Sequence, residues 1–195
     1  RNLRGTHRGM GMGLLSTGIN EIIAVTKDNA APIGIILRDG QCPKMILFKG
    51  SATEKNIRTY GWVTANFVSQ ASLYARFAFH DAEADELTTE GDMQRLRDAD
   101  AWIGFTAEVV HETEQTYLVD LTPVAETVIR PGIRRVNRGF DAVIDATVHA
   151  TRYVFNHSEE LRQRMLYDFE LIRKCGGEDE LAAKRILEEA VGFSC

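Results

Sequence analysis

The run from residue 50 to residue 66, GSATEKNIRTYGWVTAN, carries the side chains best suited to hold a phosphate group. Ser51 and Thr53 are short hydroxyl residues at the expected start of a helix, where the first backbone N–H groups lack internal partners and the helix dipole favours an anion. Lys55 adds a full positive charge within reach. The same run also fits a simpler role, in which Thr53 caps a short helix that ends at Gly61. The run by itself leaves both roles open.

Two further groups of charged residues could bind or react. Four arginines fall within nine residues, a density that suits recognition of an anion through paired hydrogen bonds, although a solvated basic turn is the simpler interpretation. These arginines are Arg130, Arg134, Arg135 and Arg138. Asp145, His149 and Arg152 lie at positions i, i+4 and i+7, on the helix face opposite the apolar residues. This spacing predicts that they pair with one another rather than perform catalysis.

Several common signatures are missing from the sequence. The remaining histidines show no ligand spacing such as HxxxH, so we expect no metal centre held by the protein. Neither a GxSxG elbow nor a GxxxxGK[ST] loop is present, which removes the commonest hydrolase and NTPase motifs. Gly9, Gly11 and Gly13 are spaced like part of a dinucleotide fingerprint, but no strand precedes them. Residues 1–17 are therefore predicted to form a flexible arm.

Composition limits the class of protein. The chain has 195 residues and 44% hydrophobic residues, enough for a full core. Its net charge of −5, with both signs interspersed, argues against a general nucleic-acid binder. The three cysteines are far apart and form no CxxC pattern, which fits reduced thiols. No apolar run is long enough for a membrane span and no signal peptide is evident, so we expect a cytoplasmic protein.

The first two-thirds of the chain alternates β-prone runs with turn residues, which predicts strands joined by hairpins. The expected strands are residues 20–26, 31–37, 44–49, 62–68, 102–112 and 116–121. Residues 70–79 are expected to be helical, and residues 81–100 form an acidic connection with a helical turn around 93–96. The short connections favour antiparallel pairing.

After Pro123 the pattern becomes helical. Residues 136–155 carry one apolar stripe over about five turns, which predicts an amphipathic helix facing the core. Residues 156–159 resemble a capping box that opens a second helix, and a final helix is expected over 178–191. Strands first and helices last indicate an α+β fold with the helices gathered on one side. The stripe comprises Val136, Phe140, Val143, Ile144, Thr147, Val148, Thr151 and Phe155.

These motifs together resemble a known superfamily. A third strand that leads into Ser-x-Thr-x-x-Asn-Ile, then a glycine and a strand reading Val-Thr-Ala-Asn, is similar to the flavin reductase-like FMN-binding split barrel. Residues 20–26, 31–34, 137–139 and 148–152 resemble one branch of it, the domain-of-unknown-function family number 447. The resemblance extends from about Gly18 onward. It implies an antiparallel split β-barrel over residues 18–130 and a C-terminal helical segment over residues 131–195 packed on the barrel.

The resemblance also implies a cofactor and its contacts. FMN would be held without a covalent bond at the interface of a homodimer, with its phosphate in the turn that contains Ser51, Thr53, Lys55 and Asn56. The first two strands would flank the isoalloxazine ring and offer backbone hydrogen bonds, and the fourth would contribute one side chain. The strand residues concerned are Asn20, Glu21, Thr26, Pro32, Gly34 and Asn66. Such residues also fit ordinary turn or edge positions, and related split barrels hold pyridoxal phosphate instead.

With FMN bound, the cofactor would carry hydride or electron chemistry, and no separate catalytic acid or base would be needed. The expected function is a flavin reductase-like oxidoreductase, with NADH or NADPH as reductant and a pterin, quinone or flavin as acceptor. Two alternatives remain: a flavin-binding carrier without turnover, and an interaction module in which the hydroxyl-rich turn only caps a helix. A fold that binds flavin does not by itself name a substrate.

Overall fold

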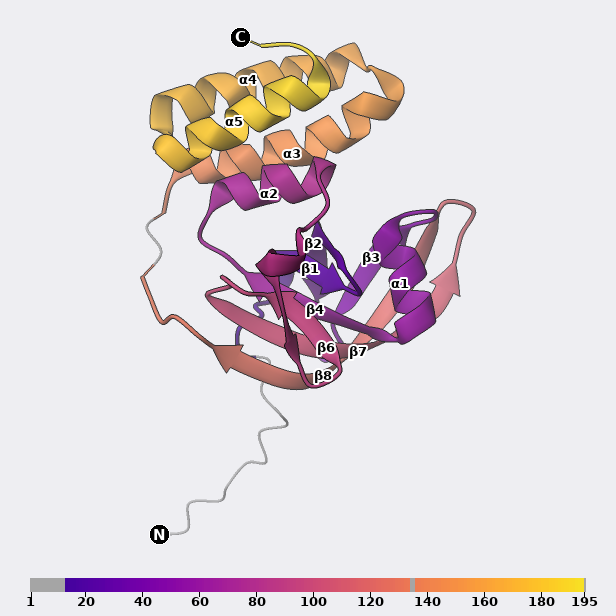
Figure 1. Cartoon of the computed structure of the whole chain (residues 1–195). Helices are drawn as coiled ribbons and strands as arrows, with labels where there is room; N and C mark the ends of the chain where they lie inside the picture. Colours follow the sequence, from indigo (N-terminus) through magenta and orange to yellow (C-terminus); the bar gives the residue numbers. More distant parts are fainter. Residues whose placement is uncertain (1–12, 134–135, 195) are drawn as a thin grey trace.

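The computed structural model describes residues 13–133 and 136–194, and a closed antiparallel barrel forms its lower half (Figure 1). The strands follow the order β1-β2-β3-β8-β7-β4 around the barrel. They are β1 Gly18–Thr26, β2 Asn29–Leu37, β3 Lys44–Phe48, β4 Trp62–Phe67, β7 Ala101–Glu112 and β8 Thr116–Val128. The expected α+β fold with an antiparallel barrel is confirmed. The predicted arm falls mostly outside the described residues, as do Arg134, Arg135 and Cys195.

The barrel has one short hydrogen-bond ladder, between β2 and β3. β1 and β2 pair along their whole length, from Gly18 with Leu37 to Thr26 with Asn29. By contrast, β2 pairs with β3 at the single position Ile36–Lys44. All of β3 instead pairs with β8. Among the described strands, β2 therefore has a ladder partner on only one side over most of its length.

Strand alternation gives the barrel two apolar faces. Ile22 and Ala24 point inward and join the barrel interior, where Phe105, Met45 and Leu121 are fully buried. Residues Ile23 and Val25 point outward and are also fully buried, because the helices cover them. A second core therefore lies between the barrel and the helical layer.

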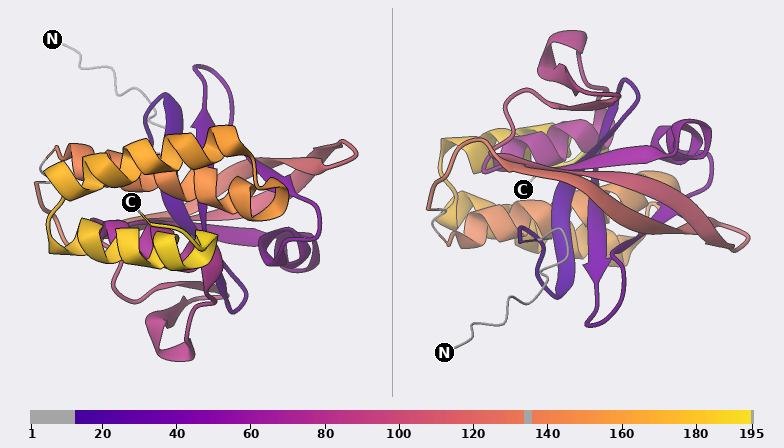
Figure 2. Two further views of the ribbon diagram at one scale, coloured as in Figure 1. Left: turned by 90° about the horizontal axis from the view of Figure 1, so that it is seen from above. Right: turned by 90° about the horizontal axis from the view of Figure 1, so that it is seen from below.

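Four of the five described α-helices stack above the barrel in two layers (Figures 1 and 2). The inner layer comprises α2, Ala71–Phe79, and α3, Arg138–Asn156, and the outer layer comprises α4, Glu159–Cys175, and α5, Glu178–Val191. Ser158 caps α4 through its Oγ, which accepts a hydrogen bond from the Leu161 N–H. Among the described residues, no helix has both the length and the apolarity needed to cross a bilayer.

One predicted helical turn is wrong. Residues 93–96 form a strand, β6 Met93–Leu96, paired with β5 Leu87–Glu90 after the short 3-10 helix η1 Ala84–Glu86. This segment finds its partners in β4 and β5 instead. The side chain of Thr64 donates to the Gln94 carbonyl at 2.7 Å, and Asn66 Oδ1 accepts from the Leu96 N–H at 2.9 Å.

The apolar stripe of α3 is also partly wrong. Val136 precedes the helix and is 91% exposed, and Phe155 near its end is 87% exposed. The buried face instead includes three alanines, which allow the neighbouring helices to approach closely. They are Ala142, Ala146 and Ala150. Apolar residue type alone therefore placed the stripe with a rotational error, because small residues carry much of this helix interface.

Candidate functional site

Helix α1, Ala52–Tyr60, follows β3 and begins in the hydroxyl-rich turn. The N-cap is Ser51, not Thr53 as the simpler interpretation expected: Ser51 Oγ accepts the Glu54 N–H at 3.2 Å. The backbone N–H groups of Ala52 and Thr53 have no hydrogen-bond partner among the described residues. Lys55 is exposed and makes no ion pair with any residue in the same ranges. An anion at this end would meet two N–H groups, a hydroxyl and an ammonium group.

Thr53 and Asn56 lie on the side of α1 opposite to Lys55 and face the turn between β1 and β2. Thr53 Oγ1 accepts from Asn29 Nδ2 at 3.0 Å, and Thr53 is 3% exposed. Asn56 Nδ2 donates to Thr26 Oγ1 at 3.0 Å and to the Lys27 carbonyl at 2.7 Å. These bonds fasten the start of α1 to the β1–β2 turn. The structure therefore brings Thr26, Thr53 and Asn56 together, as positioning residues of the turn.

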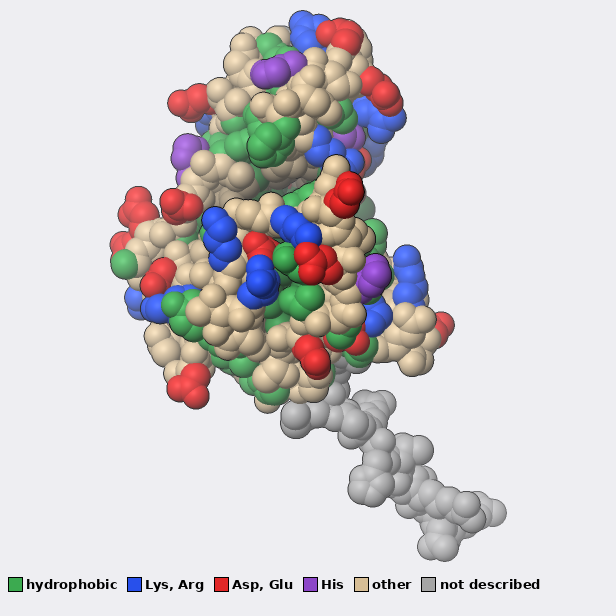
Figure 3. Space-filling model, turned by 90° about the vertical axis from the view of Figure 1, so that its right-hand side faces the viewer, with side chains coloured by type: hydrophobic (Ala, Val, Ile, Leu, Met, Phe, Trp, Pro, Cys, Tyr) green, Lys and Arg blue, Asp and Glu red, His purple; other side chains and the backbone are tan. Residues whose placement is uncertain are grey.

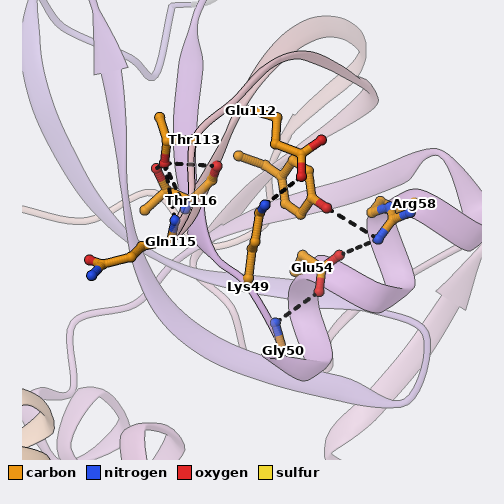
Figure 4. A network of polar contacts seen from close by, with 9 residues as sticks. Lys49, Gly50, Glu54, Arg58, Glu112, Thr113, Gln115 and Thr116 are labelled. Atoms are coloured by element: carbon orange, nitrogen blue, oxygen red, sulfur yellow. Dashed lines mark hydrogen bonds and ion pairs between the residues drawn. The ribbon is translucent and has the colours of Figure 1, made fainter.

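A buried carboxylate lies beneath the same turn (Figure 4). Glu54 Oε2 accepts the Gly50 N–H at 3.1 Å, and its Oε1 pairs with Arg58 Nη1 at 3.0 Å. A carboxylate here opposes the binding of an anion, and the guanidinium group offsets that charge. The sequence interpretation missed Glu54, although a Ser followed three residues later by Glu is the spacing of a capping box.

The tip of the β7–β8 hairpin is attached to this turn (Figure 4). The Lys49 N–H donates to the Gln115 carbonyl at 2.9 Å, and the Lys49 ammonium pairs with Glu112. The hydrogen bond from the Lys49 ammonium holds the pKa of the Glu112 carboxyl group below its ordinary value. Lys49 Nζ and the Arg58 guanidinium lie 4.9 Å and 5.2 Å from the centre of the Tyr117 ring. Nothing in the sequence pattern indicated that Tyr117 joins these two charged side chains.

The strand residues expected near a ring system lie farther along β1 and β2. Glu21 pairs with Gly34 in the ladder, five residues from Thr26, which corresponds to about 17 Å along a strand. A Cβ at Gly34 would lie 2.7 Å from Ile19 Cγ2 and 3.6 Å from Glu21 Oε1. The Ile19 side chain therefore lies over Gly34, in the space that a side chain at position 34 would need.

Other expected contact residues are occupied within the chain. Asn20 exchanges hydrogen bonds with the Ser16 backbone, at 2.9 Å to the N–H and 2.8 Å to the carbonyl. Asn66 has no exposed surface. Its Nδ2 donates to the Ile23 carbonyl at 3.1 Å, and its Oδ1 accepts from Leu96. Asn66 thus joins β4 to β1 and β6 and lies apart from the turn.

Of the four arginines, only Arg130 and Arg138 lie within the described residues. Arg130 Nε donates to Asp100 Oδ1 at 3.1 Å, while Arg138 is exposed at the start of α3. His149 does not pair with its helix neighbours as expected: its Nδ1 lies 3.1 Å from Asp168 Oδ2 on α4, because this face of α3 packs against α4. Burial raises the pKa of Asp168 despite that contact. Among the described residues, no cluster of His, Cys, Asp and Glu is arranged to hold a metal ion.

Comparison with known families matches most of the chain. The model described as "Protein of unknown function (DUF447) N-terminal domain" matches residues 20–130, and a second, described as "Protein of unknown function (DUF447)", matches residues 137–189. The two matches meet near the start of α3, where the barrel gives way to the helical layer.

Solved structures give the same result. The chain is similar to the crystal structure of FMN-bound protein MM1853 from Methanosarcina mazei, with 35% identity, coverage of 90% of this chain and 96% of that one, and a TM-score of 0.84. An FMN-binding protein from Thermus thermophilus is 15% identical over 66% of this chain and 82% of its own, with a TM-score of 0.48. The styrene monooxygenase flavin reductase from Pseudomonas putida S12 is 15% identical over 58% and 82%, with a TM-score of 0.45. At that distance the last two say nothing about a ligand in this chain.

Proposed function

Because the chain belongs to the DUF447 family, we propose that it binds FMN without a covalent bond and acts as a flavin reductase-like oxidoreductase. One observation carries the proposal: a protein that is 35% identical over 90% of the chain is described as bound to FMN. The geometry of the turn before α1 supports it, since that turn offers a phosphate two N–H donors and a cation that have no partner within residues 13–133 and 136–194.

The residues present fit a phosphate monoester. We assign its binding to the N–H groups of Ala52 and Thr53, the Ser51 hydroxyl and the Lys55 ammonium. The Ser51 oxygen already accepts the Glu54 N–H, so its own O–H remains available as a donor to a phosphate oxygen. Thr26, Thr53 and Asn56 would act through the position of α1 rather than by direct contact with the phosphate.

The isoalloxazine ring would lie along β2. Most of β2 lacks a ladder partner on the side of β3, which leaves backbone donors and acceptors for the polar edge of a ring. Pro32 and Gly34 are on the outer surface of β2, and Glu21 pairs with Gly34 from β1, whereas Asn20 pairs with the inward-facing Ile35. Asn66 would have to give up all its partners to contact a ligand, so we leave it out of the proposed contact set.

A second copy of the chain would complete the site. Alternation along β3 turns Ile46 and Phe48 outward, where they are 47% and 63% exposed, and Ile19 on β1 is 61% exposed. The side of the molecule that carries α1 shows apolar side chains among charges of both signs (Figure 3). We propose that a second copy of the chain covers this outer barrel face and that FMN lies at the dimer interface. Contact between the two copies would remove these exposed apolar side chains from water.

When bound, FMN supplies hydride or electron transfer. The chain itself binds the phosphate, orients the ring along β2 and excludes water through the dimer contact. No acid or base is needed from the described residues for these roles. NADH or NADPH is the proposed reductant.

The test begins with the purified full-length chain. We expect a flavin absorption band and close to one FMN per subunit, together with a dimer mass in light scattering. Stopped-flow mixing with NADH and with NADPH should bleach the band. Protein that is colourless and fails to bind added FMN would refute flavin binding, and binding of pyridoxal phosphate in its place would identify the other cofactor. FMN that binds but accepts electrons from neither nucleotide would favour a carrier over an oxidoreductase.

A further inference from the structure

The side chain of Glu54 is fixed next to the turn that is proposed to hold the phosphate (Figure 4). It is 4% exposed, and its Oε2 accepts the Gly50 N–H at 3.1 Å. The Glu54 N–H in turn donates to Ser51 Oγ at 3.2 Å. The carboxylate is therefore bound to the residue that precedes Ser51. Because buried charges are screened less than exposed ones, an uncompensated negative charge here would repel a phosphate.

Arg58 compensates the charge of this carboxylate. Its Nη1 lies 3.0 Å from Glu54 Oε1, one helical turn farther along α1, and Glu54 makes no other ion pair within residues 13–133 and 136–194. The Arg58 side chain is 57% exposed. Exposed pairs of this kind are ordinarily weak, because holding two long side chains in one geometry costs entropy. The compensation of Glu54 therefore depends on what else holds the guanidinium group.

Tyr117 on β8 holds the guanidinium group next to Glu54. The centre of its buried ring lies 5.2 Å from Arg58 Cζ, within the range of a cation–π contact. Lys49 Nζ lies 4.9 Å from the same ring, but it pairs with Glu112 on β7. The Lys49 charge is thus already compensated, and Arg58 is left to Glu54. The β7–β8 hairpin therefore fixes a side chain of α1.

We propose that Arg58 is a positioning residue for the flavin phosphate and that it acts through Glu54. This role rests on the proposed function, since it requires the phosphate to lie at the Ser51 turn. Arg58 cancels the charge of the carboxylate and keeps it on the Gly50 N–H, beneath the turn. The guanidinium group contacts Glu54 and the Tyr117 ring rather than the ligand. The preference for FMN over riboflavin therefore depends on a side chain that touches neither.

The preference is measured as the ratio of the Kd for riboflavin to the Kd for FMN, from flavin fluorescence quenching by the purified chain. Arg58→Gln removes the cation and leaves the Glu54 carboxylate in place, so this ratio should fall about tenfold through weaker FMN binding. Riboflavin, which lacks the phosphate, should bind as it does to the wild type. Because the repulsion acts between charges, the fall should become smaller as salt is added.

Further variants test whether Arg58 acts through Glu54. Glu54→Gln removes the charge and keeps an oxygen for the Gly50 N–H, so the double variant with Arg58→Gln should regain the wild-type ratio. Arg58→Lys keeps the positive charge and should lower the ratio less than Arg58→Gln does. Arg164→Gln is the matched control, because Arg164 on α4 is also 57% exposed and pairs with a glutamate four residues earlier, Glu160. It should leave the ratio unchanged.

Four outcomes would overturn this role of Arg58. An unchanged ratio in Arg58→Gln would do so while leaving FMN binding intact. A ratio that stays low in the double variant would show that Arg58 contacts the phosphate itself. Equal losses for FMN and riboflavin, together with lower stability in urea unfolding, would leave Arg58 a purely structural role. Wild-type protein that fails to bind FMN would refute the proposed function, and the role of Arg58 would fall with it.

Discussion

Replacement of Ser51 by aspartate separates the two roles of the turn before α1. Aspartate is as good an N-cap as serine, so Ser51→Asp should preserve the cap on the Glu54 N–H and the stability of the fold. It also places a carboxylate at the position proposed for the phosphate. FMN binding should therefore weaken strongly, while binding of riboflavin, which lacks the phosphate, should change little.

The size of the effect follows from charge. A carboxylate about 5 Å from a phosphate of roughly −1.5 charge, at an effective dielectric constant of about 40, is repelled by about 2.5 kcal/mol. This corresponds to an increase of about 70-fold in the Kd for FMN. Loss of the Ser51 O–H donor adds to it, while Lys55, which stays in place, reduces it.

Flavin fluorescence quenching measures both dissociation constants, and urea unfolding measures stability. Ser51→Asn is the matched control, because asparagine caps a helix equally well without a charge. It should bind FMN far better than Ser51→Asp does. Equal losses for FMN and riboflavin, or no loss for either, would show that the phosphate does not lie at this turn. A large drop in stability in Ser51→Asp would instead show that the cap geometry was disturbed.

Three further predictions follow. Asn56→Ala removes the bonds that fasten α1 to the β1–β2 turn, so the free energy of unfolding should fall by about 1–2 kcal/mol in urea titrations; an unchanged value would mean that α1 is held otherwise. Gly34→Ala adds a Cβ 2.7 Å from the exposed side chain of Ile19, which can move, so stability should hardly change. If the ring lies on β2, this variant should weaken FMN and riboflavin equally in fluorescence titrations, and a loss confined to FMN would contradict that placement. Burial raises the pKa of Asp168 above its ordinary value of 3.8, so the folded state holds this proton more tightly than the unfolded state does. The wild type therefore loses stability as the pH rises from 3.8 to the raised pKa. Unfolding of Asp168→Asn at a series of pH values should show its stability rising relative to the wild type from about pH 4 upward, and a constant difference would refute the cause.

Local patterns predicted most elements because local chemistry decides them. The final helix, Glu178–Val191, was expected at these bounds, and the left-handed Gly61 ends α1 as expected. Residues 93–96 were misread because their backbone partners lie in other strands, and the local sequence carries no information about such partners. Tertiary contacts likewise decided that His149 pairs across to α4.

In the candidate site, too, the local sequence does not show which side chains make tertiary contacts. Ser51 and Lys55 are four residues apart and share one face of α1, whereas Thr53 and Asn56 are three apart and share another. The helical period therefore separates the two pairs in the sequence itself. Which pair faces outward depends on where the β1–β2 turn docks, and that contact joins residues more than twenty positions apart.

The unpaired side of β2 explains why one ligand could reach both groups of residues. Both β2 and β3 are β-prone, and a full ladder between them would have covered Gly34 and left no room beside α1. The two strands instead separate after the Ile36–Lys44 pair, since β3 follows β8. This separation opens an edge that runs from Gly34 toward the start of α1. Variants at the two ends of this edge should therefore affect flavin binding differently. Ser51 variants should weaken FMN binding more than riboflavin binding, and Gly34 variants should weaken both equally.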